Sequence, residues 1–236
     1  GAHAIPPPFA KNRQGYLQQI EQQMLPAIAA ERLADYIDVF CEEGFFSVDE
    51  SRQVLEAGMR HGLVPKIHAN QLHLSGGVQL GVALGALSVD HLEQMDAAAI
   101  ETLAGSNTIG TLLPTAAMFL RMPYPPARAL VQAGCAIALA SDYNPGSSPS
   151  GNMNLVVALS CINMRLTPVQ AMLAATTNAA HAMQVQHLAG SIAVGKRANL
   201  ILTRPVPNME YLPYAFGHNH IEQVFINGQP WQPQRL

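Results

Sequence analysis

Charged side chains are scarce in this chain, and neither sign dominates. Only 12% of its 236 residues are charged, and 13 basic against 16 acidic residues give a formal net charge of −3. A protein that binds nucleic acid through its phosphates needs a basic patch, so this balance predicts no nucleic-acid partner. Hydrophobic residues make up 49% of the chain, which indicates that much of it is buried.

Two further absences exclude other classes of protein. No uninterrupted apolar segment reaches the roughly 18 residues of a membrane-spanning helix, so we expect no membrane insertion. The three cysteines, Cys41, Cys135 and Cys161, are widely spaced and lie in apolar runs. This pattern favours core packing in a reducing compartment over a disulfide framework or thiol catalysis, and we therefore expect a cytoplasmic protein.

The start of the chain lacks an initiating methionine and a leader. It opens with Gly1-Ala2-His3-Ala4 and then reaches three consecutive prolines, with neither a charged stretch nor an apolar signal core. We expect the chain to be the C-terminal part of a longer protein.

Helix-like and strand-like segments alternate through most of the chain. Helices are expected over 14–24, 47–61, 76–85, 96–104, 125–133, 151–164 and 167–182, with another short helix opened by Pro26. Strands are expected over 36–40, 64–68, 87–91, 108–113 and 136–141. Repeats of this length predict parallel strands joined by crossover helices. A doubly wound sheet fits the alternation as well, but no Gly-x-Gly-x-x-Gly follows a first strand to support a nucleotide site.

Three residues that can bind a metal end these strands: His68, His91 and Asp142. From His68 to His91 is 23 residues, about one strand–helix unit, and from His91 to Asp142 is 51, about two. The carboxyl ends of parallel strands meet at the face where barrel enzymes place their chemistry. Imidazole and carboxylate suit zinc or ferrous iron. Spacing alone is equally compatible with a structural histidine and a helix-capping aspartate.

The tail differs from the rest of the chain. Residues 195–202 and 221–227 are predicted strands, with a turn at Asn227-Gly228. Two strands alone are marginal, so we expect partners from outside this chain, against which Trp231 packs. His218-Asn219-His220 has metal-ligand spacing, but its place between short strands favours a structural or surface role.

Several motifs resemble those of the imidazolonepropionase family of metal-dependent amidohydrolases. Three of them combine into a specific signature, namely Lys66–Leu72 (KIHANQL), Ala86–Glu93 (ALSVDHLE) and Ala140–Ser147 (ASDYNPGS). Weaker matches are Gly1–Ala4, Val39–Glu42, Thr177–Ala180 and Val194–Leu200, the last of which is common to many amidohydrolases. The resemblance covers essentially the whole chain.

The resemblance implies a fold and an activity. The fold is α/β, with the C-terminal portion of a TIM-like (β/α)8 barrel, about strands 3–8, over residues 1–188 and C-terminal strands of a small composite β-sandwich domain over 189–236. The activity is hydrolysis of the ring amide of 4-imidazolone-5-propanoate to N-formimidoyl-L-glutamate, in histidine degradation. It would use one divalent metal, Zn or Fe, and a homodimer is common among enzymes of this kind.

The resemblance also implies a role for individual residues. His68, on the fifth barrel strand, and Asp142, on the eighth, would bind the metal, and Asp142 would act as general base. His91, on the sixth strand, would stabilise or protonate the tetrahedral intermediate. The substrate contacts that it implies are His3, Gln71, Asn144, Gly146 and Ser147. Gln71 stands where some relatives have Glu, so its role here would be hydrogen bonding only.

One family signature is absent from this chain. Amidohydrolases of this type take two further ligands from a His-x-His on the first strand, and no such pair precedes His3. A barrel without its first strands would expose two buried strand edges. Two alternatives therefore stay open: another cyclic amidohydrolase or deaminase with the same metal set, and an inactive fragment or pseudoenzyme that lacks those ligands.

Overall fold

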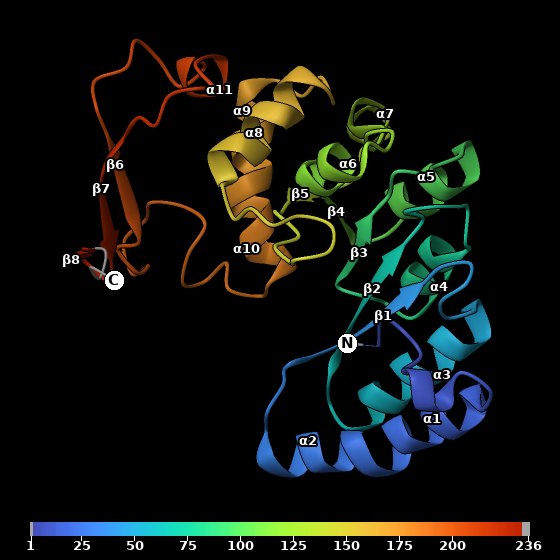
Figure 1. Ribbon diagram of the computed structural model, residues 1–236. Coiled ribbons are helices and arrows are strands. Elements are labelled where there is room, and N and C mark those ends of the chain that lie inside the picture. Colours follow the sequence, from blue (N-terminus) through green and yellow to red (C-terminus); the bar gives the residue numbers. More distant parts are fainter. Residues whose placement is uncertain (1, 233–236) are drawn as a thin grey trace. The chain divides into compact units, whose positions relative to one another are not determined.

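The computed structural model describes residues 2–232, which form two compact units (Figure 1). The first unit runs to Leu112 and includes Ala129–Ile137, and the second comprises Leu113–Arg128 and the residues from Ala138 onward. The domain boundary predicted between residues 188 and 189 falls within the second unit and stays a prediction. No helix within residues 2–232 is long and apolar enough to cross a membrane.

A parallel sheet forms the centre of the first unit and confirms the predicted α/β class. Its strands follow chain order: β1 (Tyr36–Cys41), β2 (Val64–Ala69), β3 (Ser88–His91) and β4 (Ile109–Leu112), then β5 (Ile137–Leu139), of which only Ile137 belongs to the first unit. The first four pair in parallel with their neighbours. Ala2 adds to the edge of β1, because its amide donates to the Asp38 carbonyl at 2.8 Å and its carbonyl accepts from Phe40 at 2.9 Å. This pairing places His3 beside β1.

Crossover helices connect the strands, as the alternation predicts. They are α3 (Val48–Arg60), α4 (Gly77–Ala83) and α5 (Ala97–Ala104). The capping box at α3 is confirmed, since Ser47 and Glu50 each accept the other's backbone amide hydrogen through their side chains. Asp96 caps α5 by accepting from the Ala99 amide at 2.8 Å. These bonds satisfy amides that a helix start leaves open.

The helical segment before β1 is more continuous than predicted. A 3-10 turn, η1 (Pro7–Phe9), precedes a run built of α1 (Arg13–Gln19), the π-helical turn η2 (Ile20–Met24) and α2 (Leu25–Glu31). Separate helices were expected over 14–24 and after Pro26. Proline has no amide hydrogen for the carbonyl four residues back, and a widened turn accommodates that loss without ending the helix.

Most of the second unit is helical. Its helices include α6 (Pro114–Leu120), α8 (Met153–Ile162), α9 (Pro168–Leu173) and α10 (Ala179–Ala182). Helix α7 (Ala127–Gln132), most of which belongs to the first unit, matches the helix predicted over 125–133. The single helix predicted over 167–182 is interrupted by the π-helical turn η3 (Ala174–Asn178), although its capped start at Thr167 is confirmed. Sequence analysis missed α6, because it follows a strand with no polar cap and only Pro114 marks its start.

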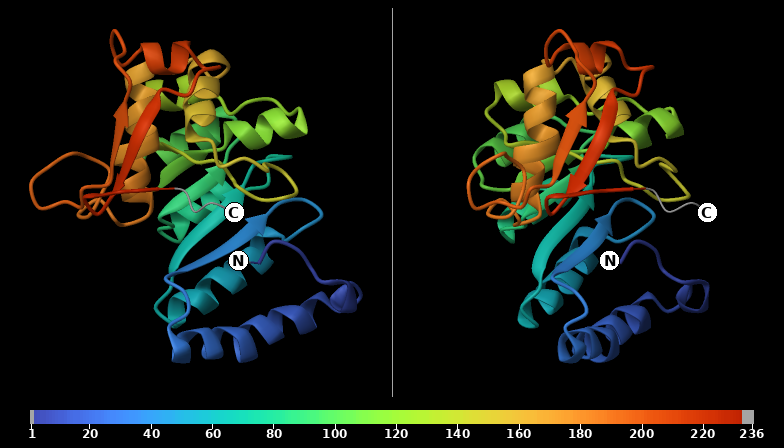
Figure 2. Two further views of the ribbon diagram at one scale, coloured as in Figure 1. Left: turned by 60° about the vertical axis from the view of Figure 1, so that its left-hand side comes forward. Right: turned by 90° about the vertical axis from the view of Figure 1, so that its left-hand side faces the viewer.

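The C-terminal part of the second unit is a small antiparallel sheet. Strands β6 (Leu200–Thr203) and β7 (Ile221–Ile226) run side by side in both views of Figure 2, with the short helix α11 (Tyr211–Tyr214) between them in sequence. Asn227 and Gly228, with φ of 51° and 78°, form the predicted turn. A third strand, β8 (Gln229–Pro230), was not predicted, because it is two residues long and contains a proline.

Candidate metal centre and active site

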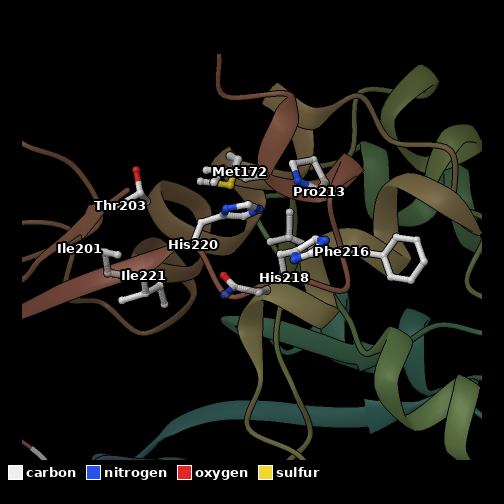
Figure 3. Close-up of a pocket in the computed structure, with 11 residues that line it drawn as sticks. Met172, Ile201, Thr203, Pro213, Phe216, His218, His220 and Ile221 are labelled. Atoms are coloured by element: carbon white, nitrogen blue, oxygen red, sulfur yellow. The ribbon is translucent and has the colours of Figure 1, made fainter. Parts of the chain in front are cut away.

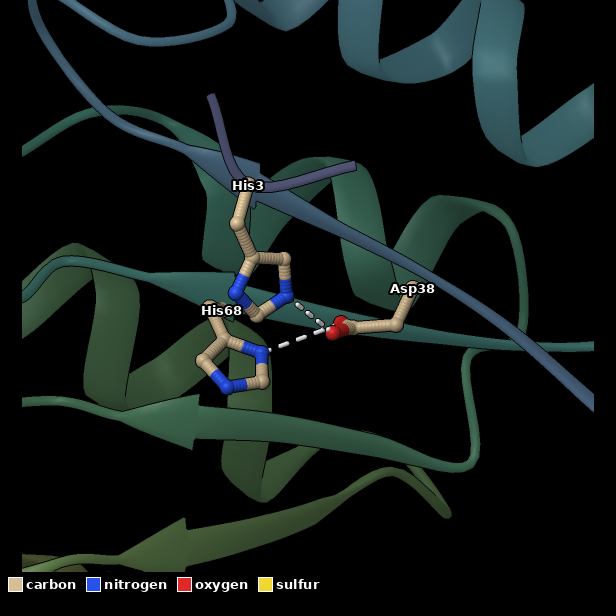
Figure 4. Close-up of side chains that lie close together, drawn as sticks. All are labelled: His3, Asp38 and His68. Carbon is tan, nitrogen blue, oxygen red and sulfur yellow. Dashed lines mark hydrogen bonds and ion pairs between the residues drawn. The ribbon is translucent and has the colours of Figure 1, made fainter. Parts of the chain in front are cut away.

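Two histidines and one aspartate meet at the β1–β2 side of the sheet. His3 Nε2 lies 2.6 Å from Asp38 Oδ2, and His68 Nδ1 lies 3.0 Å from Asp38 Oδ1, so each carboxylate oxygen contacts one imidazole. Figure 4 shows both rings directed at this carboxylate. The arrangement follows from register: Phe40 pairs with His68, and Asp38, two residues before Phe40, shares its face of the sheet.

The Asp38 carboxylate is held in its charged form. Burial alone would raise its pKa, but the neighbouring imidazoles of His68 and His3 outweigh burial and hold the pKa of Asp38 well below its usual range. An ionised Asp38 draws the proton of His68 to Nδ1, and Asp90 Oδ2 stands 3.9 Å from the same nitrogen. Metal-binding histidines commonly have one ring nitrogen held in this way by a carboxylate, while the other nitrogen binds the ion.

The donor atoms of this cluster suit a divalent ion. One ligand atom from each of His3, Asp38 and His68 lies within 4.8 Å of the others. Two imidazoles and a carboxylate are donors that zinc and ferrous iron both accept. The donor types present therefore fit a metal of this class, with Asp38, whose two oxygens contact the imidazoles, supporting His68 rather than binding the ion.

His91 lies next to this cluster at the end of β3. Its ring centroid is 5.3 Å from that of His68, and its side chain is buried. Both His91 and the following Leu92 have positive φ values, of 88° and 68°. Backbone strain of this kind in residues other than glycine is concentrated at functional sites. The structure thus brings together His68 and His91, two of the three residues expected at one sheet face, and places His3, which only the resemblance indicated, beside them; their roles stay predictions.

The loop after β2 fixes Gln71 through a buried carboxylate. Glu42 Oε2 accepts the amides of Gln71 at 3.1 Å and Leu72 at 2.9 Å, and Glu42 Oε1 lies 3.2 Å from His73 Nδ1. Asn70 has φ of 55° and donates its side-chain amide to the Gln94 carbonyl at 2.9 Å. These contacts make the loop a rigid continuation of the strand that carries the predicted metal ligand His68.

Asp142 lies in the second unit, on a loop that is braced by its own side chains. Ser147 Oγ donates to Asp142 Oδ2 at 2.8 Å, and Asn144 Nδ2 donates to the Asp142 carbonyl at 2.8 Å. Asn144 Oδ1 accepts the amides of Gly146 and Ser147, each at 2.8 Å. Two predicted substrate contacts, Asn144 and Ser147, therefore also hydrogen-bond the predicted metal ligand.

The strand that leads to Asp142 is shorter than predicted. β5 ends at Leu139 rather than at Ser141. The carbonyl of Ser141 accepts hydroxyl hydrogens from Thr115 at 2.8 Å and Ser148 at 2.6 Å instead of extending the strand. Asp142 is therefore a loop residue, with φ of 52°.

Four buried or half-buried carboxylates near the predicted residues were missed: Asp38, Glu42, Asp90 and Glu93. Asp38 and Asp90 carried a usable signal, because a charged residue inside an apolar strand needs a partner when it is buried. Glu42 and Glu93 each follow a strand by one or two residues, where an acidic residue is also common in exposed loops. Their importance depends on burial, which the sequence pattern does not specify.

A hollow within the second unit has a different character. Its cavity of about 190 Å³ is lined mainly by apolar side chains from α8, α9, α11 and the ends of β6 and β7, and Figure 3 shows His218 and His220 among them. No carboxylate is among its lining residues. His220 Nε2 is buried without a hydrogen-bond partner in the described part of the chain. This setting favours the structural interpretation of the His-x-His motif.

Relatives of this chain share one enzymatic name. The imidazolonepropionase of Flavobacterium johnsoniae is 53% identical over 97% of this chain and 56% of its own length. The imidazolonepropionase of Geobacillus thermodenitrificans is 44% identical over 97% of this chain and 54% of its own length. The chain thus spans about half the length of these relatives.

Solved structures share the fold at low sequence identity. An adenosine deaminase from Xanthomonas campestris with bound zinc matches 88% of this chain and 55% of its own, with a TM-score of 0.70 and 19% identity. The A. niger ochratoxinase matches 91% of this chain and 54% of its own, with a TM-score of 0.69 and 20% identity. The amidohydrolase family model matches residues 46–230, and the chain belongs to the amidohydrolase family.

Proposed function

We propose that the protein containing this chain hydrolyses the ring amide of 4-imidazolone-5-propanoate to N-formimidoyl-L-glutamate in histidine degradation. The observation that carries the proposal is its similarity, at 53% and 44% identity over 97% of the chain, to the two imidazolonepropionases. The imidazoles and carboxylates gathered at the strand ends supply groups of the kind that amide hydrolysis requires.

The proposal includes one divalent metal, zinc or iron, held by His68 and Asp142. Amidohydrolases depend on metals, and the donor set around His68 fits such an ion. Asp38 supports His68 in this role by holding its Nδ1. When bound, the metal would polarise the scissile carbonyl and lower the pKa of the attacking water.

The side chains of this chain then have distinct tasks. Asp142 accepts a proton from the attacking water and returns it to the leaving ring nitrogen. Ser147, which donates to Asp142 Oδ2, holds that carboxylate in one orientation during both transfers. His91 stabilises the oxyanion that develops on the carbonyl oxygen, a contribution commonly worth about 3–4 kcal/mol per donor.

Substrate binding is assigned to residues that the structure already holds in place. His3 and Gln71 contact the imidazolone ring or its propionate, and the loop of Asn144, Gly146 and Ser147 holds the substrate and the open-chain product. The backbone amides of Gln71 and Leu72 are committed to Glu42, so the Gln71 side chain is the part of that loop left to hydrogen-bond a ligand.

The proposal extends to location and assembly. Three free cysteines, Cys41, Cys135 and Cys161, suit the reducing environment of the cytoplasm, where we place the enzyme as a homodimer. Cell fractionation and light scattering of the complete natural protein test these two points.

Turnover of Asp142→Ala on 4-imidazolone-5-propanoate tests the mechanism in the complete natural protein. We expect kcat to fall by about 10³-fold or more, since general base and metal ligand are lost together. Asp35→Ala, at an exposed carboxylate, is the matched control and should leave kcat unchanged. Retained turnover in Asp142→Ala contradicts the assignment of Asp142.

Metal content and substrate choice test the activity itself. A wild-type protein with less than about a tenth of an equivalent of zinc or iron and no turnover contradicts the proposed function. Faster hydrolysis of another cyclic amide, or deamination of a nucleoside, places the enzyme elsewhere among metal-dependent hydrolases.

A further inference from the structure

A second carboxylate–imidazole pair lies just beyond β3, at His91 and Glu93. The side chain of Glu93 is fully buried, and that of His91 is 4% exposed. Neither carboxylate oxygen of Glu93, nor Nδ1 of His91, has a hydrogen-bond partner among the described residues. Glu93 Oε1 and His91 Nδ1 stand 3.5 Å apart. Two of these three atoms, Oε1 and Nδ1, are thus close to each other.

Burial makes this pair informative. A carboxylate enclosed by protein without a donor is strongly disfavoured, because water no longer solvates it and nothing replaces the water. The neighbouring Asp90 shows how a buried carboxylate is usually stabilised, since its Oδ1 accepts a hydrogen bond from the Ser88 hydroxyl at 2.7 Å. For Glu93, the Nδ1 of His91, 3.5 Å from Oε1, is the imidazole nitrogen that pairs with it.

The backbone is strained in a way that creates this pair. His91 and Leu92 both adopt left-handed φ values, which an L-residue with a side chain disfavours. The strained turn is clamped on both sides: the Leu92 amide donates to the Ala69 carbonyl at 3.3 Å, and the Gln94 amide donates to the Asn70 carbonyl at 2.8 Å. Its consequence is that Glu93 turns inward beside His91 rather than outward to solvent.

We propose that Glu93 is a positioning residue that accepts the Nδ1–H of His91 and fixes its ring. With Nδ1 committed to Glu93, Nε2 is the nitrogen that faces the reacting carbonyl. The buried carboxylate also balances the positive charge of the imidazole whenever both ring nitrogens carry protons. The inference rests on the proposed function, in which His91 contacts the developing oxyanion.

Glu93→Gln in the complete natural protein tests the proposal, because the amide keeps the shape of the side chain and removes its charge. We expect kcat to fall by about 10–100-fold with KM within about threefold, the loss typical of a group that orients an active-site histidine. Glu101→Gln, at an exposed position of α5, is the matched control and should change neither constant.

The tautomer of His91 is a second measurement, and it would not change if Glu93 had only a structural role. NMR of the ring nitrogens in histidine-labelled protein should show a protonated Nδ1 on His91 in the wild type, and this signal should shift in Glu93→Gln. A wild-type His91 with an unprotonated Nδ1 overturns the proposal even where the variant fails to fold. A kcat within about threefold of wild type in Glu93→Gln also overturns it.

The two proposals fail in different ways. If the wild type does not hydrolyse the imidazolone, the proposed function is wrong, while the His91 ring signals still decide whether Glu93 holds Nδ1. If the wild type is active and its His91 signals do not respond to Glu93→Gln, the positioning role is wrong and the proposed function is untouched.

Discussion

Two pairs of histidines in the described part of the chain, His3–His68 and His218–His220, differ in their neighbours. His3 and His68, in the first unit, have ring centroids 4.5 Å apart and share the carboxylate of Asp38. His218 and His220, in the second unit, have centroids 6.0 Å apart and line an apolar hollow whose lining includes no carboxylate. By spacing alone, the second pair is the better metal motif, because it has the His-x-His form.

This difference indicates that the group beside a histidine, rather than the histidine itself, decides whether the imidazole is suited to bind a metal or transfer a proton. A carboxylate holds one ring nitrogen protonated and leaves the other as a ligand or proton carrier. An imidazole among apolar side chains has neither an oriented proton nor compensation for a positive charge. The His218–His220 pair therefore carries the sequence signature of a metal site without the surroundings of one.

The largest expected effect separates the two pairs directly. In the complete natural protein, His68→Ala should abolish metal retention and lower kcat/KM by about 10³-fold or more, because a ligand is lost. His218→Ala is the matched control, an exposed member of the other pair, and should leave both within about twofold. Metal analysis and steady-state kinetics check both variants. Metal loss in His218→Ala with metal retained in His68→Ala would contradict this prediction and point to His218 and His220 as the metal site.

A smaller effect is expected when the shared carboxylate is altered and the histidines are kept. Asp38→Asn retains an oxygen acceptor but removes the charge that fixes Nδ1 of His68. Metal affinity should fall by about 10–100-fold, the usual consequence of losing such a partner. Competition with a chelator measures it. An unchanged affinity contradicts the role given to Asp38.

The sequence predicted much of the first unit because local signals there agree with the fold. Strand–helix alternation located β1 to β4 within one or two residues of their observed ends, and the caps at Ser47 and Asp96 mark true helix starts. It failed where the signal was weak or absent. The start of α6 has no polar cap, and the π-helical turn η3 arises from hydrogen bonding within a helix that periodicity predicts as continuous.

The site was predicted only in part, for a similar reason. His68 and His91 were found because they end strands at regular intervals. Asp38 becomes important through the register that pairs Phe40 with His68, which no local pattern specifies. Glu93 becomes buried through positive φ values at His91 and Leu92, and a turn of that kind is expected from sequence only where glycine or asparagine stands.

Acid should weaken the interaction of Asp38 with His3 and His68. The folded-state pKa of Asp38 lies below its usual value, so its ionised form stabilises the folded state. That contribution is full above about pH 4 and is lost as the pH falls further toward the folded-state pKa. Urea unfolding of metal-free protein should therefore show Asp38→Asn less stable than wild type by about 1–3 kcal/mol near neutral pH.

The stability difference between these two proteins should shrink as the pH is lowered below about 4. A difference that does not depend on pH would mean that the charge of Asp38 is not what stabilises the His3–Asp38–His68 cluster. Asp35→Asn, at an exposed carboxylate, is the matched control and should change the free energy of unfolding by no more than about 0.5 kcal/mol.

The smallest effect is expected in the apolar hollow, where a substitution should stabilise the folded protein rather than destabilise it. His220 Nε2 is buried without a hydrogen-bond partner in the described part of the chain, so the imidazole loses solvation and gains nothing in return. His220→Phe keeps a ring of similar size and removes that polar atom, which should raise the free energy of unfolding by about 0.5–1 kcal/mol and leave kcat unchanged. Thermal melts and kinetics measure both. A loss of activity in His220→Phe would show that this imidazole has a partner or a ligand in the working enzyme. The two histidine pairs would then differ in the ligand that each binds, and not in whether a carboxylate lies beside them.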